Sequence, residues 1–105
     1  MRFVETHVFT TAIDRHLDDE QYRQLQIALM LRPEQGAVIR GAGGLRKVRW
    51  ATTGAGKRGG LRVIYYWEPR GHAFYMVYAY RKSEQGDLTP SQMRQLSRVV
   101  REEFR

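Results

Sequence analysis

Lysine and arginine side chains that could bind phosphate groups are concentrated in the middle of the chain. Residues 36–82 contain ten Lys and Arg residues but only one acidic residue, Glu68, whereas residues 1–35 and 83–105 carry no excess of positive charge. Clustered like charges repel one another unless an anion neutralises them. The distribution therefore favours an acidic partner, and nucleic acid is the leading class. The ten cations are Arg40, Arg46, Lys47, Arg49, Lys57, Arg58, Arg62, Arg70, Arg81 and Lys82.

Two neighbouring strands are predicted in this basic region, and they are expected to form a hairpin. Alternation along the first strand puts Lys47 and Arg49 on the same side. Arg62 can lie beside them on the second strand, and Lys82 is expected at the end of a third. The pattern predicts a cationic catalytic site formed by Lys47, Arg49, Arg62 and Lys82.

Such a site could cleave a phosphodiester without a metal or cofactor. Arginine keeps its charge and its planar fork suits bidentate phosphate binding, so Arg49 and Arg62 are expected to matter most for turnover. Clustered charges disfavour protonation of their neighbours, so Lys47 or Lys82 could accept or donate a proton. Phosphate binding alone, or solvation of a strand edge, is the alternative role of each residue. Histidine is not expected to act at any of its positions, His7, His16 and His72.

A second set of side chains is expected to bind a nucleic acid without taking part in chemistry. Cations at strand ends and in turns can contact phosphates, and aromatic rings can stack on unpaired bases. Tyr66 shares the side of Arg62, and Tyr80 shares the side of Tyr78. Core packing is the favoured role of these rings, and stacking is the functional alternative. The set comprises Arg46, Lys57, Arg58, Tyr66, Tyr80 and Arg81.

The elements that must position these residues predict one α+β domain over residues 1–105. The sheet is expected to be twisted and mostly antiparallel, with the helices packed on one face. Two capping boxes, Asp18 with Gln21 and Thr89 with Gln92, mark helix starts. The predicted order is a strand at 3–10, a helical turn at 12–16, a helix at 19–31, strands at 45–50, 61–67 and 73–80 with a basic turn at 53–60, and a helix from 90 onward.

Composition favours a cytoplasmic protein. Cysteine is absent, which fits a reducing compartment. No apolar run approaches the roughly 20 residues needed to cross a bilayer, and the first residues lack the apolar stretch of a signal peptide. A soluble cytoplasmic protein with no membrane partner is expected.

Three segments in the same order resemble motifs of the RelE/HigB-like toxins of type II toxin–antitoxin systems, in the RelE/ParE superfamily. Residues 41–50 resemble the segment GxGGLRKxR, residues 56–66 resemble GKxGGxRVIYY, and residues 80–89 resemble YxKxxxxDLT. Residues 3–6 resemble the opening strand. The likeness covers nearly the full chain, and three motifs in order are far more specific than one.

The resemblance implies a RelE-like fold and a ribosome-associated endoribonuclease that cuts translated mRNA. It also implies a cognate antitoxin, usually a DNA-binding repressor, that holds the toxin inactive. The chain departs from better-studied relatives at Asp87 and Leu88, where those carry an aromatic residue, and this leaves the leaving-group acid open. Two alternatives remain: a non-catalytic nucleic-acid-binding module, and a gyrase-directed toxin of the same fold.

Overall fold

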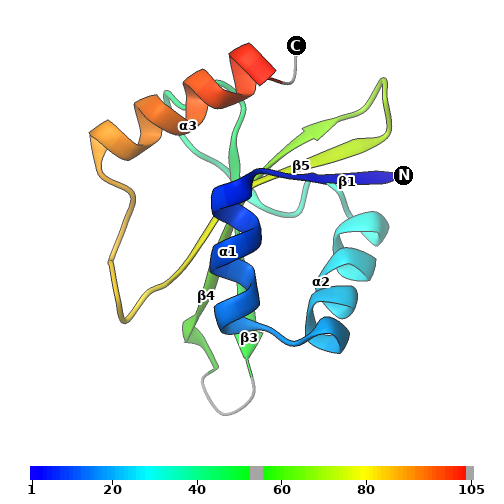
Figure 1. Ribbon diagram of the computed structural model, residues 1–105, viewed down its shortest axis with the longest axis vertical. Helices are drawn as coiled ribbons and strands as arrows, with labels where there is room; N and C mark the ends of the chain where they lie inside the picture. Colours follow the sequence, from blue (N-terminus) through cyan, green and yellow to red (C-terminus); the bar gives the residue numbers. More distant parts are fainter. Residues whose placement is uncertain (53–55, 104–105) are drawn as a thin grey trace.

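The computed structural model describes residues 1–52 and 56–103, without the side chains of residues 52–59. Figure 1 shows how the elements are arranged. Helix α3 lies at the top of the view, α1 and α2 lie below it, and the segment 82–89 runs along the left edge. No helix in the described ranges is long and apolar enough to cross a membrane. The elements are β1 (Arg2–Glu5), α1 (His7–His16), α2 (Asp19–Leu31), β2 (Ala37–Val38), β3 (Arg46–Thr52), β4 (Gly56–Glu68), β5 (Ala73–Arg81) and α3 (Pro90–Glu103).

The strands form one mixed sheet in the order β1-β5-β4-β3-β2. β1 pairs in parallel with β5, and the other neighbouring strands are antiparallel. The predicted α+β class is confirmed. β4 lies at the centre and is hydrogen-bonded on both sides, so a side chain on β4 is held more firmly than one at an edge.

The two faces of the sheet carry separate apolar cores. Val63 and Tyr65 of β4 pack with α1 and α2 residues such as Leu25. Ile64, which alternation turns to the other face, packs with Val100 of α3. The expectation that the helices share one face therefore holds for α1 and α2, whereas α3 covers the opposite face.

The start of the chain differs from the predicted strand at 3–10. The strand ends at Glu5, and α1 takes up the rest together with the predicted helical turn at 12–16. Thr6 caps the helix, because its hydroxyl accepts a hydrogen bond from Phe9 N at 3.0 Å and donates one to Val77 O at 2.9 Å. Phe9 and Ile13, four residues apart, are buried on one helical face. This helical spacing outweighs the weak alternation of the first residues.

The hairpin of β3 and β4 and the third strand β5 form as predicted, but β4 begins earlier. Gly56 pairs with Thr52, so residues 56–60 belong to β4 and not to a turn. The rest of the predicted turn, residues 53–55, lies outside the described residues. The short β2, which pairs with Arg46 and Lys47, was not predicted.

Both predicted capping boxes are present, and α2 has the predicted bounds. Asp18 accepts a hydrogen bond from Gln21 N at 2.8 Å, and the Gln21 side chain accepts one from Asp18 N at 2.9 Å. Thr89 and Gln92 make the equivalent pair at 3.1 and 3.0 Å. Each box satisfies backbone donors that the first helical turn leaves without partners.

Replacing Asp18 by alanine is expected to lower the free energy of unfolding by about 0.5–2 kcal/mol, because Gln21 N loses its acceptor. Urea denaturation monitored by circular dichroism measures the change. Asp14→Ala, on the exposed side of α1, is the matched control and should alter stability by less than about 0.5 kcal/mol. Equal losses in the two variants would contradict a stabilising role for the cap.

Candidate functional site

Strand register places predicted site residues in a row across the centre of the sheet. Arg49 of β3 is the cross-strand partner of Arg62 of β4, and Arg62 is the partner of Tyr80 of β5. Directly paired residues project from the same face, with Cβ atoms about 4.5–5.5 Å apart. Lys47 lies two residues from Arg49 and shares this face. We call this surface, formed by Lys47, Arg49, Arg62 and Tyr80, the basic face.

Lys82, the fourth predicted catalytic residue, follows β5 directly. Its backbone N–H donates to Gly60 O at 3.3 Å, so the β4–β5 pairing continues to this residue. Lys82 is exposed. It therefore lies at the end of the strand that carries Tyr80, two positions beyond that ring.

The cations of the basic face differ in burial. Arg49 is exposed and Lys47 half-buried, whereas Arg62 is only 3% exposed and donates to Gly60 O at 3.4 Å. A guanidinium keeps its positive charge even when buried. Arg49 can thus contact a ligand directly, and the neighbouring buried Arg62 adds a fixed charge.

Asp87 also belongs to this region, although its residue type and position in the sequence did not predict a role there. The Lys47 ammonium lies 3.2 Å from its carboxylate across forty positions of sequence. Both residues line a hollow of about 320 Å³ together with Tyr80 and Leu88. The hollow lies beside the basic face and is large enough to receive part of a ligand.

The Tyr80 hydroxyl is a buried polar group next to these charges. The residue is 3% exposed, and its hydroxyl has no hydrogen-bond partner among the described residues. Burial raises the pKa of the phenol, and the Asp87 carboxylate raises it further, whereas Arg62 opposes them. The hydroxyl therefore keeps its proton and can donate a hydrogen bond.

Two predicted binding residues lie away from the basic face, because alternation turns them to the other side of the sheet. Arg46 donates to Glu34 O at 3.0 Å and to Gly36 O at 2.9 Å. Arg81 donates from Nε to His16 Nδ1 at 3.2 Å. The structure thus does not bring these two side chains together with Arg49 and Arg62.

Of the two predicted stacking rings, Tyr66 is partly accessible and Tyr80 is buried. Tyr66 is half-buried on the face of Arg62 and stacks on Tyr75, with ring centroids 6.2 Å apart. Tyr80 stacks on Tyr78 at 5.8 Å, and Tyr78 is the more exposed of the two. Tyr78 is therefore the better placed ring for contact with a ligand. The side chains of the predicted residues Lys57 and Arg58 lie outside the described part of the structure.

The glycine-rich loop precedes β3, the strand that carries Lys47, and is not followed by a helix. Gly41, Gly43 and Gly44 have φ angles of 75°, 68° and 97°, which favour glycine. A Cβ on Gly44 would also lie 2.9 Å from the Tyr66 ring. The loop is therefore built for close packing.

Within the described ranges, no group of three or more His, Asp or Glu residues could hold a metal ion.

Comparisons with known proteins bear on the family and the fold of this chain. A family model described as the RelE toxin of the RelE/RelB toxin–antitoxin system matches residues 1–104. A solved structure of the Escherichia coli toxin RelE, a mutant with two arginines changed to alanine in the free state, shares the fold with a TM-score of 0.55. Its sequence is 14% identical, and the match covers 89% of this chain and 93% of that one. The chain belongs to the RelE toxin family and is a toxin of a toxin–antitoxin system.

Proposed function

We propose that this toxin is an endoribonuclease that cuts mRNA on the translating ribosome. The observation that carries the proposal is the row Arg49–Arg62–Tyr80 across the centre of the sheet, with Lys47 on the same face and Lys82 at the end of β5. Three rigid strands hold these groups, which favours a preorganised site for a phosphate over a diffuse basic surface.

The proposed reaction is attack of a ribose 2′-oxygen on the adjacent phosphorus. The 2′-hydroxyl gives up its proton, a bond forms between the 2′-oxygen and phosphorus, and the bond to the 5′-oxygen breaks. The products are a 2′,3′-cyclic phosphate and a 5′-hydroxyl that has taken up a proton. No metal or cofactor is required when side chains supply the proton transfers and stabilise the phosphorane charge.

The accessible cations divide these tasks. Arg49 binds the non-bridging oxygens directly. The fixed charge of Arg62 beside it attracts the phosphorane more strongly than the bound substrate, because negative charge develops in the transition state. The two proton transfers fall to Lys47 and Lys82. Asp87 orients the Lys47 ammonium at 3.2 Å. Such positioning is required because proton transfer needs a hydrogen-bond distance to the reacting oxygen.

Membership of the family implies an antitoxin partner. We propose that this partner is a DNA-binding repressor that keeps the nuclease inactive in the cytoplasm. Residues 36–82 contain ten cations and one acidic residue. This charge supports an acidic segment of the partner that binds over the basic residues and neutralises them. The same positive charge favours the anionic RNA of the ribosome as the environment in which mRNA is cut.

Mapping of RNA 5′ ends after brief induction tests the proposal. Wild-type protein should produce new ends with 5′-hydroxyls inside translated regions, and Arg49→Ala should reduce them by at least about tenfold. Arg23→Ala, an exposed arginine on α2, is the matched control and should cut like wild type. If growth arrest occurs without new ends, the cleavage proposal is wrong, and a binding role at the same face takes its place.

A further inference from the structure

His16 joins the last turn of α1 to the turn that follows β5. Its Nδ1 accepts a hydrogen bond from Arg81 Nε at 3.2 Å, and its Nε2 lies 3.4 Å from Glu84 Oε1. The His16 side chain is only 8% exposed. Because Nδ1 accepts a hydrogen bond, the proton of the neutral ring sits on Nε2, which faces the carboxylate. The neutral imidazole thus contacts both ends of one short segment.

That segment carries Lys82. Glu84 N and Gln85 N both donate to Arg81 O, at 3.0 and 3.1 Å, so residues 81–85 form a compact turn. Lys82 lies between the two residues that His16 contacts. The position of the Lys82 backbone therefore depends on the contacts of His16 as well as on the β4–β5 pairing.

The same turn is connected to the other side of the basic face. The Gln85 side chain donates to Asp87 O at 2.9 Å and to Gln92 Oε1 at 2.7 Å, at the start of α3. The Asp87 carboxylate contacts the Lys47 ammonium. A continuous series of contacts runs from His16 through the turn to Lys47. Displacement of the turn would thus affect both lysines.

We propose that His16 is a positioning residue of this toxin: its neutral imidazole fixes the turn that carries Lys82 against α1, and protonation of the ring releases the turn. The inference rests on the proposed RNA cleavage for its catalytic consequence. A proton on Nδ1 would face the Arg81 Nε–H, and two donors cannot share a hydrogen bond. The hydrogen bond to Arg81 must then break.

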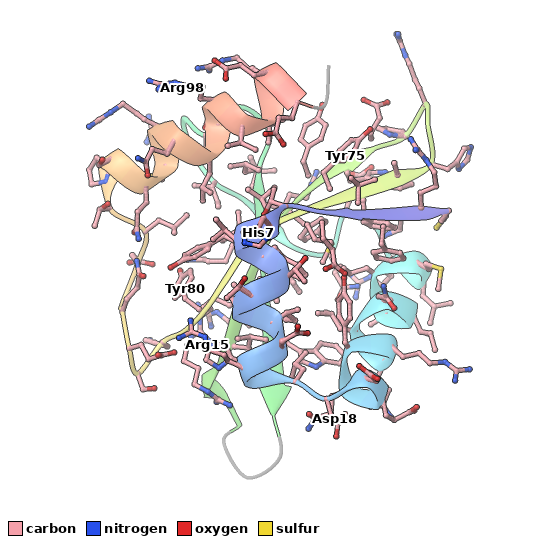
Figure 2. The ribbon with its side chains drawn as sticks, in the orientation of Figure 1. His7, Arg15, Asp18, Tyr75, Tyr80 and Arg98 are labelled. Atoms are coloured by element: carbon pink, nitrogen blue, oxygen red, sulfur yellow. The ribbon has the colours of Figure 1, made fainter. Side chains whose placement is uncertain are left out.

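The surroundings of the ring favour its neutral form. Burial lowers the pKa of His16, and the charges of Arg81 and Arg15 lower it further, whereas Glu84 raises it. Figure 2 shows Arg15 and Tyr80 on the same side of α1, and both line a small hollow of about 130 Å³ with the ring. The ionisable groups around the ring are Arg15, Tyr78, Tyr80, Arg81 and Glu84.

The direction of the pH effect follows from this lowered pKa. The folded protein binds the His16 proton less readily than the unfolded chain, whose histidine has the usual pKa of 6.5. The hydrogen bond from Arg81 is complete above about pH 6.5 and is lost as the pH falls through the lower pKa of the folded state. The charged ring then repels the Arg81 guanidinium and, among the described residues, keeps only Glu84 as a partner. Cleavage should therefore decline on the acid side of neutrality.

His16→Phe tests the proposal, because phenylalanine keeps a ring of similar shape but cannot accept the hydrogen bond from Arg81 or bind a proton. With a defined mRNA on programmed ribosomes at about pH 7.5, kcat should fall about 10–100-fold with little change in KM, since small displacements of reacting groups cost this much. His7→Phe, on the exposed first turn of the same helix, is the matched control and should cleave like wild type. A wild-type kcat in His16→Phe would overturn the proposal.

The pH profile separates positioning from a general loss of structure. As the pH is lowered from about 7.5 to 5, the ratio of wild-type to His16→Phe activity should fall. Only the wild type binds a proton at this position, so only the wild type loses activity through it. Glu84→Gln removes the carboxylate that raises the pKa of His16, so its acid decline should move to lower pH. Identical pH profiles in all three proteins would also overturn the proposal.

Amide hydrogen exchange tests the same inference without cleavage. After correction for intrinsic exchange, residues 82–88 should be less protected at about pH 5 than at pH 7.5 in the wild type, and poorly protected at both in His16→Phe. Equal protection throughout would overturn the role of His16, whatever the activity. If the exchange follows this pattern but the wild type cuts no RNA, the proposed function alone fails.

Discussion

Replacement of Arg62 by alanine is expected to lower kcat for RNA cleavage by about 10²–10³-fold with a much smaller effect on KM. Arg62 lies on the central strand, paired across the ladder with Arg49 and with Tyr80, and is only 3% exposed. Its charge acts through a poorly solvated part of the protein, where electrostatic interactions are stronger than in water. Because the phosphorane carries more negative charge than the bound substrate, the loss should fall on the transition state.

Two further variants separate the charge of Arg62 from its structural contribution. Arg62→Lys keeps a positive charge but loses the planar fork, so its kcat should lie between those of the wild type and the alanine variant. Because the side chain is buried, thermal unfolding of each variant is measured, and the assays are run well below the midpoint. A variant that keeps kcat and loses only salt-dependent affinity would identify a binding module without nuclease activity.

The core of the basic face could be predicted because alternation is a local property of a strand. The pattern of β3 places Lys47 and Arg49 together, and the pattern of β4 gives the face of Arg62. The hairpin then brings the two strands into register. No long-range information was needed for these three residues.

Contacts between distant segments could not be predicted in this way. Lys47 meets Asp87 only because the segment before α3 returns to the sheet, and His16 meets Arg81 only because α1 packs against β5. Arg81 is next to Lys82 in sequence and equally charged, yet its side chain points to α1. Charge counts treat such neighbours alike, whereas the pleat separates them.

The helices show the same division between local and distant information. The capping boxes at Asp18 and Thr89 fix two helix starts, because their hydrogen bonds span only three residues. Leu96 and Val100 of α3 pack on the face of Ile64. The path of the segment 82–89 decides this, because it carries the chain to that side of the sheet before α3 begins. An amphipathic pattern gives a helix an apolar side but does not select a partner for it.

Tyr65→Phe is expected to lower the free energy of unfolding by about 2–4 kcal/mol, since each buried group left without a partner costs about 1–3 kcal/mol. The Tyr65 hydroxyl donates to Pro33 O at 2.8 Å and accepts from Gly36 N at 3.0 Å. The ring itself is fully buried, so Tyr65→Ala should cost more, about 3–5 kcal/mol. A chain of this length has a total stability of only about 5–15 kcal/mol.

Urea denaturation of Tyr65→Phe beside Tyr66→Phe measures this contribution on adjacent positions of β4. Tyr66 is half-buried and stacks on Tyr75, a contact that phenylalanine keeps, so removal of its hydroxyl should cost less than about 0.5 kcal/mol. Tyr65 holds the segment before β2, where Gly36 lies so close that a Cβ would come within 2.8 Å of the ring. Arg46 binds the same segment, so loosening it would loosen β3 next to Lys47. Equal stability of the two variants would show that water replaces the Tyr65 hydroxyl, and that the site does not depend on this anchor.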